Sequence, residues 1–208
     1  MTLIVHHLEN SRSQRVLWLL EELGIPYDVR RYERNPKTML APPELKRIHP
    51  LGKSPVVDDG GIIVAETGAI VDYLVAKAGG RCGAPAEPDA ANRYRFYQHY
   101  AEGSVMPWLL VMLVIRRLGL LGRPARSTVQ RMLDTHFTFL EGELASRDWF
   151  AGDEFTAADV MMSFPLETAR VRAGLGPSHP NLIHWLERIH ARPAYQAALA
   201  KGGPYDYA

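Results

Sequence analysis

The chain has 208 residues, of which 47% are hydrophobic and 23% are charged, so it is long enough to bury a full core in one or two domains. Its 24 Lys and Arg residues balance 23 Asp and Glu residues, which leaves a net charge of +1. This near-neutral balance gives no electrostatic reason to expect a nucleic acid or an anionic membrane as partner. Small molecules and other protein chains remain as candidate partners.

Membrane and secretion signals are weak. The first 15 residues have no long apolar core of the signal-peptide kind. The apolar run Pro107–Ile115 is much shorter than the ~20 residues that span a bilayer. We therefore expect a cytoplasmic protein.

Strand and helix signals alternate over the first 79 residues, bounded by Gly, Pro and Asp residues that favour turns. The predicted strands are Leu3–Val5, Tyr27–Val29 and a hairpin within Ser54–Val64, and the predicted helices are Ser13–Leu23 and Thr67–Ala78. Gly24 follows the first helix as a favoured C-terminal cap. The order β-α-β, loop, β-β-α predicts a thioredoxin-like α/β domain over residues 1–79.

From Pro88 onward, strand signals are largely absent and long helical patterns replace them. The predicted helices are about Asp89–Leu121, Arg126–Ser146, Thr156–Ala173, Asn181–Ala191 and a short one near Tyr195. Pro107 lies inside the first of them and predicts a kink, because proline removes a backbone donor. We expect residues 80–88 to be a linker and residues 89–208 to form an all-α domain.

Polar side chains lie between the first strand and the first helix. Asn10, Ser11 and Ser13 stand beside a helix N-terminus, whose backbone N–H groups lack partners within the helix. This setting suits an anion such as a thiolate, because one hydrogen bond to a charged group contributes ~1.5 to 3 kcal/mol. The alternative is that Ser11 or Ser13 only caps the helix, where serine is strongly preferred.

Two further segments suit a peptide ligand. A cis bond between Ser54 and Pro55 would turn the backbone of Ser54 toward an incoming extended peptide, whereas a trans proline would simply open the strand. Glu66 and Thr67 either cap the next helix or hold the ammonium and carboxylate groups of an α-amino acid. Lys53 is a candidate partner for a second carboxylate, unless it is only solvated.

The eight histidines do not form a metal-binding pattern. His6 and His7 would face opposite sides of a strand, and His184 and His190 are not helical neighbours, so we expect no metal.

A different motif belongs to folding rather than to chemistry. Thr156 and Asp159 fit a capping box before an apolar run, with Asp in place of the usual Glu or Gln. We assign both residues a structural role.

Taken together, the order and spacing of these motifs resemble the cytosolic glutathione transferase superfamily, and most closely its bacterial and fungal serine-type, theta-like members. The resemblance covers nearly the whole chain. The motifs are Ser11–Leu23, His49–Val56 (HPLGKSPV), Glu66–Ile70, Phe155–Asp159 and Arg192–Tyr195. It implies the glutathione transferase fold, glutathione as co-substrate, conjugation of the glutathione thiolate to small hydrophobic electrophiles, and a homodimer.

The resemblance also implies roles for single residues. Ser11 is the catalytic hydroxyl that stabilises the glutathione thiolate. Lys53 faces the glycine carboxylate, and Ser54, before the cis proline, pairs with the cysteinyl backbone. Glu66 and Thr67 hold the γ-glutamyl end.

Some roles stay open at this point. Asn10, Ser13 and backbone N–H groups are alternatives to Ser11 at the thiolate. Tyr97 and Met106 are candidate walls of an electrophile pocket, or else only core or dimer contacts.

The type of chemistry is open as well. The chain has neither the N-terminal tyrosine of the mammalian alpha, mu and pi types nor a cysteine at position 11, which argues against direct cysteine redox chemistry. A glutathione-dependent peroxidase or disulfide reductase is the alternative enzyme, and a non-catalytic regulatory protein of the same fold is the alternative of another class.

Overall fold

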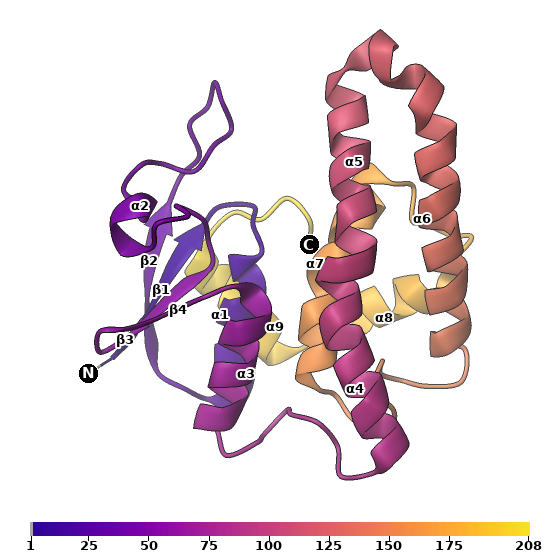
Figure 1. Ribbon diagram of the computed structural model, residues 1–208. Coiled ribbons are helices and arrows are strands. Elements are labelled where there is room, and N and C mark those ends of the chain that lie inside the picture. Colours follow the sequence, from indigo (N-terminus) through magenta and orange to yellow (C-terminus); the bar gives the residue numbers. More distant parts are fainter. Residues whose placement is uncertain (1) are drawn as a thin grey trace. The chain divides into compact units, whose positions relative to one another are not determined.

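The computed structural model of the chain describes residues 2–208, which form two compact units (Figure 1). The first unit comprises residues 2–83 together with His190–Asp206 and Ala208, and the second comprises Ala84–Ile189 and Tyr207. An α/β first domain and a helical second domain were predicted, and this fold is confirmed. The last helix, however, belongs to the first unit, although the sequence placed it in the helical domain.

The first unit is built on a four-stranded sheet with the strand order β2-β1-β3-β4. Strand β1 (Leu3–Leu8) pairs in parallel with β2 (Tyr27–Tyr32), as a β-α-β segment with a right-handed crossover requires. Strand β3 (Val56–Asp59) pairs antiparallel with both β1 and β4 (Ile62–Ala65). The predicted hairpin is therefore confirmed as β3 and β4.

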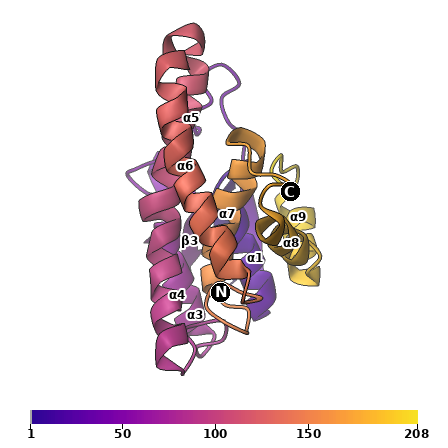
Figure 2. The ribbon, with the colours of Figure 1, turned by 90° about the vertical axis from the view of Figure 1, so that its right-hand side faces the viewer.

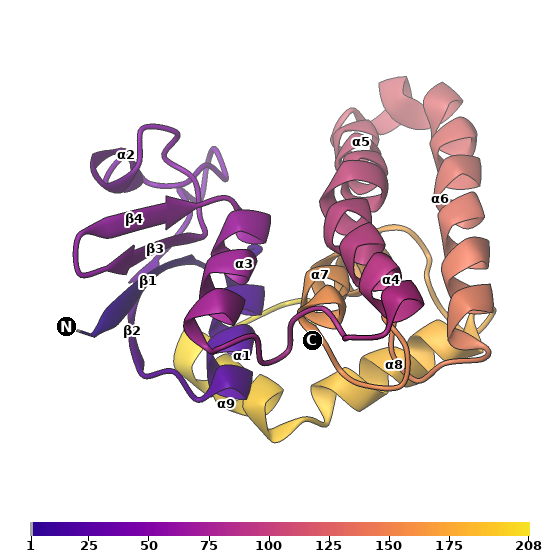
Figure 3. The same ribbon diagram turned by 60° about the horizontal axis from the view of Figure 1, so that its bottom comes forward.

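Helix α1 (Ser13–Leu23) is the central helix of the first unit and is buried along most of its length. Its neighbours in the first unit are β1, α3 (Thr67–Lys77) and α9 (Pro193–Gly202), as Figure 3 shows. Their packing against α1 explains its burial. Gly24 ends α1 in the left-handed conformation, with φ 59°, as predicted.

The two faces of β1 have different neighbours. On one face, His6 Nδ1 lies 2.9 Å from the hydroxyl of Tyr32, and Leu8 packs against the short helix α2 (Leu45–Ile48). On the other face, His7 hydrogen-bonds to the first turn of α1. The two histidines thus face opposite sides, as the strand period predicts, and residues 2–208 contain no cluster of three or more His, Cys, Asp or Glu side chains able to hold a metal ion.

The second unit is built from helices, with the mostly buried α7 in contact with α4 and α5, and with α5 beside α6 (Figure 2). The helices are α4 (Pro88–Tyr100), α5 (Met106–Arg117), α6 (Arg123–Leu144), α7 (Ala157–Arg172) and α8 (Pro180–His190), with a 3₁₀ turn at Gly119–Gly122. None of the helices within residues 2–208 combines the length and the apolar character needed to cross a membrane.

The long helix predicted over Asp89–Leu121 is interrupted. A single π-helical turn, Ala101–Val105, separates α4 from α5, and Pro107 lies in the first turn of α5. Pro107 has no backbone N–H and its ring crowds the preceding turn, and the wider π turn accommodates both effects.

Helix α7 begins with the predicted capping box. The Thr156 hydroxyl accepts a hydrogen bond from the N–H of Ala158 (3.3 Å), and Asp159 Oδ2 accepts one from the N–H of Thr156 (3.0 Å). Asp159 Oδ1 also accepts from the N–H of Phe150 (3.0 Å) and from Trp185 Nε1 (3.3 Å). Burial raises the pKa of Asp159 to about 6, even though these hydrogen bonds act in the opposite direction.

Candidate functional site

Three segments singled out in the sequence meet at one end of the sheet. Strand β3 begins directly after Pro55, and β4 ends directly before Glu66. The register places Val56 opposite both His6, near the end of β1, and Ala65, the last residue of β4. The loop before α1, the cis proline and the start of α3 therefore share one edge of the first unit.

The backbone N–H of Leu8, the last residue of β1, ties two of these segments together. It donates to Ser13 Oγ at 3.2 Å and to Ser54 Oγ at 3.1 Å. The Ser54 hydroxyl in turn donates to the carbonyl of His6 at 2.8 Å. The bond between Ser54 and Pro55 is cis, which confirms the prediction, and Ser54 lies outside the ladder that pairs β1 with β3.

The two serines at the start of α1 are not equivalent. Ser13 is fully buried, and its Oγ lies 2.8 Å from His7 Nδ1 and 2.7 Å from Ser11 Oγ. Ser11 retains 5% of its surface exposed, and its Oγ also accepts from the N–H of Ser13 at 3.3 Å. Ser13 is thus enclosed by protein groups, and Ser11 is the serine of the pair with surface left for a ligand.

Asn10 is held from the far end of the chain. Its Nδ2 donates to Asp206 Oδ2 at 2.7 Å, and its Oδ1 accepts from the N–H of Asp206 at 2.8 Å. The backbone of Asn10 is left-handed, with φ 48°, a conformation that asparagine tolerates well. Both ends of the amide are therefore occupied by Asp206, a residue that no local sequence pattern identifies.

The start of α3 is open toward the surface. Glu66 precedes the helix with φ 71° and ψ 126°, an unusual conformation for a residue with a side chain, and such strain is concentrated at ligand sites. Its exposed carboxylate makes no capping hydrogen bond, so the capping alternative for this residue is not realised. Thr67 is 4% exposed and is the first helical residue.

Lys53 lies next to this edge in the chain, directly before Ser54. Its side chain is exposed, and its ammonium group has no hydrogen-bond or ion-pair partner among residues 2–208. A free ammonium beside the cis proline suits an anionic ligand group.

His7 was considered in the sequence only as a metal ligand, but the structure places it behind the serines. Burial, helped by the charge of Arg31, lowers the pKa of His7 to about 4, while a hydrogen bond to the backbone of Gly202 acts in the opposite direction. His7 is therefore uncharged at neutral pH. The strand period did indicate its side of the sheet, but not its contact with Ser13.

Tyr97 and Met106 are placed differently from their predicted role as pocket walls. Tyr97 is 1% exposed, its hydroxyl donates to Glu143 at 2.8 Å, and its ring lies 4.7 Å from that of Phe150. Met106 is 2% exposed. Both side chains are buried, which fits the core alternative for these two residues.

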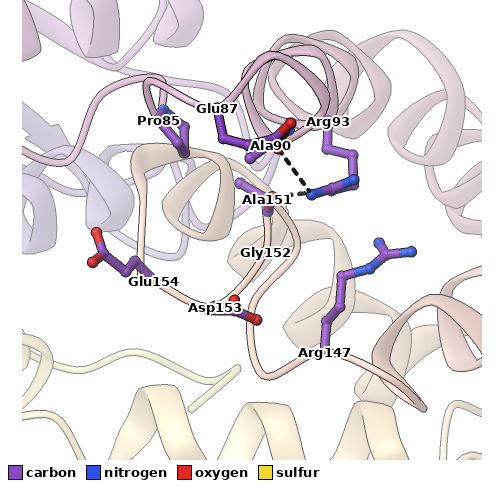
Figure 4. A pocket seen from close by; sticks show the side chains of 9 residues that line it. All are labelled: Pro85, Glu87, Ala90, Arg93, Arg147, Ala151, Gly152, Asp153 and Glu154. Atoms are coloured by element: carbon purple, nitrogen blue, oxygen red, sulfur yellow. Dashed lines mark hydrogen bonds and ion pairs between the residues drawn. The ribbon is translucent and has the colours of Figure 1, made fainter.

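The second unit does have a hollow of about 440 Å³, at the start of α4 (Figure 4). Its lining is Pro85, Glu87, Ala90, Arg93, Arg147, Ala151, Gly152, Asp153 and Glu154. Both arginines that line it are already engaged: Arg93 Nε donates to the carbonyl of Ala151 at 3.0 Å, and Arg147 pairs with a carboxylate of α6 at 2.8 Å. Neither Tyr97 nor Met106 belongs to this lining.

Comparison with known proteins gives a consistent family. The model of the glutathione S-transferase N-terminal domain matches residues 11–77, and that of the C-terminal domain matches residues 105–193. Glutathione S-transferase 3 of Schizosaccharomyces pombe is 34% identical over 215 residues, which cover 96% of this chain and 87% of that protein.

Solved structures agree. The crystal structure of a glutathione S-transferase from Actinobacillus pleuropneumoniae matches with a TM-score of 0.88 and 32% identity, over 99% of this chain and 95% of that one. A glutathione transferase homologue from Sulfitobacter, with bound glutathione, matches with a TM-score of 0.82 over 97% of this chain and 98% of that one. Its identity is 21%, so this likeness concerns the fold.

Proposed function

The chain belongs to the glutathione S-transferase family, and we propose that it binds glutathione at the shared edge of the first unit and conjugates it, through its thiolate sulfur, to small hydrophobic electrophiles. The observation that carries this proposal is the convergence of the loop before α1, the cis Pro55 and the start of α3. An extended tripeptide with charged groups at both ends and a thiol in the middle needs these three kinds of partner.

Each end of glutathione has a matching group. The γ-glutamyl end carries an ammonium group, which the exposed carboxylate of Glu66 binds, and a carboxylate, which Thr67 and the first N–H groups of α3 bind. The ammonium of Lys53 pairs with the glycine carboxylate. The cysteinyl backbone pairs with the backbone of Ser54, in the manner of an added strand.

Ser11 stabilises the thiolate in this proposal. Lowering a thiol pKa from about 8.5 by two units requires roughly 2.7 kcal/mol of preference for the charged form. One hydrogen bond to the sulfur contributes about 1.5 to 3 kcal/mol, and the N-terminus of α1 adds roughly 0.3 to 1 kcal/mol. Ser11 is favoured over its neighbours because Asn10 is held by Asp206 and Ser13 is fully buried.

Calorimetric titration with glutathione tests the site. The wild-type protein should bind, and Glu66→Ala should weaken binding about 10- to 100-fold, since a charge-assisted hydrogen bond is lost. Glu187→Ala serves as the matched control, because Glu187 is an exposed glutamate of α8, with its side chain 71% accessible. Equal dissociation constants for all three proteins would remove Glu66 from the site.

A second variant tests the thiolate. Ser11→Ala should raise the pKa of the bound glutathione thiol and lower turnover near neutral pH, with little change in stability. An unchanged thiol pKa would transfer the role to the backbone N–H groups at the start of α1.

The group that the thiolate attacks separates the candidate functions. The same thiolate attacks an electrophilic carbon in a transferase, or a peroxide or disulfide in the alternative enzyme. Turnover of an activated aryl halide, a hydroperoxide and a mixed disulfide should be compared at one glutathione concentration, with the highest rate expected for the aryl halide. Tight glutathione binding without turnover of any of the three would instead support a regulatory protein.

We also propose a homodimer that uses α3 and α4. Phe96 on α4 supports this, because it is 46% exposed although it lies within an aromatic cluster, with its ring 4.9 Å from that of Tyr100. Light scattering should give twice the chain mass for the wild type and a monomer for Phe96→Glu. A dimer in both would exclude this part of α4 from the interface.

A further inference from the structure

We propose that Ser13 and His7 direct the hydroxyl hydrogen of Ser11 inward, so that they restrain the donation of a hydrogen bond from Ser11 to the glutathione sulfur. This inference rests on the proposed function and deepens it, since it concerns the same thiolate. It makes Ser13 and His7 positioning residues that act through Ser11.

The three side chains form a continuous chain of hydrogen bonds. Ser11 Oγ and Ser13 Oγ are 2.7 Å apart, and Ser13 Oγ and His7 Nδ1 are 2.8 Å apart. Both distances require a hydrogen between the two heavy atoms. Ser13 is fully buried and His7 is 2% exposed, so water does not replace either partner.

The hydrogens can be counted. A serine hydroxyl has one hydrogen to donate and two lone pairs that accept. The N–H of Leu8 already donates to Ser13 Oγ at 3.2 Å. The single hydrogen of Ser13 therefore goes to one of three acceptors, which are His7 Nδ1, Ser11 Oγ and the carbonyl of Leu8 at 3.2 Å.

The tautomer of His7 decides among them. Gly202 is the last residue of α9, so its carbonyl accepts no hydrogen bond within the helix, and in the hydrogen bond between His7 and the Gly202 backbone the ring donates to that carbonyl. Gly202 lies at the Nε2 side of the ring, because a Cβ on that glycine would approach Nε2 to 3.4 Å. Since His7 is uncharged, a hydrogen on Nε2 leaves Nδ1 bare, and Nδ1 accepts the hydrogen of Ser13.

This tautomer fixes the direction of all the hydrogen bonds in the series from Ser11 to His7. With the hydrogen of Ser13 on His7 Nδ1, the short contact between the two serines is filled by the hydrogen of Ser11. Ser11 then offers a lone pair, not a hydrogen, to a ligand. To donate to a thiolate, Ser11 has to turn its hydrogen outward, which leaves two serine oxygens 2.7 Å apart unless Ser13 turns as well and gives up His7.

The charged groups around His7 maintain this direction. Arg31 opposes protonation of the imidazole, and Glu9 favours it more weakly than the hydrogen bond to Gly202 does. An imidazolium would carry hydrogens on both nitrogens. It would reverse the direction of these hydrogen bonds, because Nδ1 would then donate to Ser13. The neutral ring therefore restrains thiolate formation relative to a Ser11 without these neighbours.

The first experiment measures the tautomer directly in the ligand-free, wild-type protein. Nitrogen-15 NMR at neutral pH should show the hydrogen of His7 on Nε2, with the signal assigned by its loss in His7→Asn. A hydrogen on Nδ1 would overturn the inference, whatever the protein does with glutathione. This measurement decides the question even if the serine variants fail to fold.

The second experiment measures whether loss of the Ser13 hydroxyl raises or lowers the thiol pKa of bound glutathione. Thiolate absorbance against pH gives the thiol pKa of bound glutathione in the wild type, Ser13→Ala and Ser13→Thr. Ser13→Ala should lower that pKa, with about a tenfold larger thiolate fraction below it, because Ser11 loses its inward acceptor. Ser13→Thr keeps the hydroxyl and should match the wild type, as should Ser163→Ala, a buried serine of α7 that serves as control.

A raised or unchanged thiol pKa in Ser13→Ala would overturn the inference, because a purely supporting Ser13 has that effect. The double variant Ser11→Ala/Ser13→Ala should match Ser11→Ala alone, since Ser13 acts through Ser11. Absence of glutathione binding in calorimetry would contradict the proposed function instead, and the NMR measurement would still test the hydrogen-bond direction.

Discussion

Acidification from neutral pH to about pH 4 should remove about 3 kcal/mol of folding free energy through His7 alone. The ordinary pKa of 6.5 applies to the unfolded chain, whereas burial and Arg31 lower the pKa to about 4 in the folded protein. Between these values the unfolded chain binds a proton that the folded protein does not. The stabilisation is therefore complete above about pH 6.5 and is lost progressively as the pH falls toward 4.

Asp159 acts in the opposite direction over nearly the same range. Its pKa is raised from 3.8 to about 6, so the folded protein binds the proton more strongly than the unfolded chain does. Its contribution is greatest below about pH 3.8 and falls by about 3 kcal/mol as the pH rises to 6. The two buried groups therefore compensate each other in the wild-type protein.

Replacement of His7 should separate its contribution to stability from that of Asp159. Urea unfolding at several pH values gives the free energy of unfolding for the wild type and for His7→Asn, which keeps an acceptor for Ser13 but does not titrate. The free energy of unfolding of the wild type, relative to that of His7→Asn, should fall by about 3 kcal/mol from pH 6.5 to pH 4. The carboxylates that both proteins share titrate in both, so their contributions cancel in this difference. A difference that is constant across this range would refute the reasoning.

Three substitutions test contacts within one or the other unit by urea unfolding. Thr156→Ala should cost about 1 kcal/mol, because the N-terminus of α7 loses its cap, and Thr156→Ser should restore most of it. Glu22→Ala should cost about 2 kcal/mol, because the Glu22 carboxylate accepts hydrogen bonds from Arg192, at 2.5 and 2.8 Å, and from the indole N–H of Trp18, at 2.8 Å. No loss of stability would show that α9 docks without the pair of Arg192 and Glu22. Gln14→Met should add about 1 kcal/mol, because both amide atoms of Gln14 are buried without a hydrogen-bond partner among residues 2–208, and a loss of stability would contradict this reasoning.

Features set by neighbouring residues in the chain were predictable. The left-handed Gly24, the hairpin of β3 and β4 and the capping box of Thr156 and Asp159 each depend on a few consecutive side chains. The cis bond before Pro55 was different, because base rates oppose it and only the resemblance to a family supported it. Local chemistry therefore predicts most of the fold. Part of the candidate site was predicted only from the resemblance to a family.

Contacts between distant parts of the chain were not predictable. The sequence predicts a short helix near Tyr195, but not that this helix, α9, packs against α1, and the pair of Arg192 and Glu22 is separated by 170 positions. The contact of Asn10 with Asp206 spans 196 positions. Such pairs are fixed by tertiary packing, for which a single sequence carries no period or motif.

The serine motif at the start of α1 does not by itself determine the chemistry of the candidate site. A serine before the first helix places an oxygen near the expected sulfur, but stabilisation of a thiolate requires the hydrogen on that oxygen to point outward. In this chain the direction of the hydrogen is set one and two side chains further in, by Ser13 and by an uncharged His7. Two proteins with the same Ser11 but different groups behind it would bind glutathione alike and ionise its thiol differently. The property that separates a fast transferase from a glutathione-binding protein can therefore lie in buried residues that never touch the ligand.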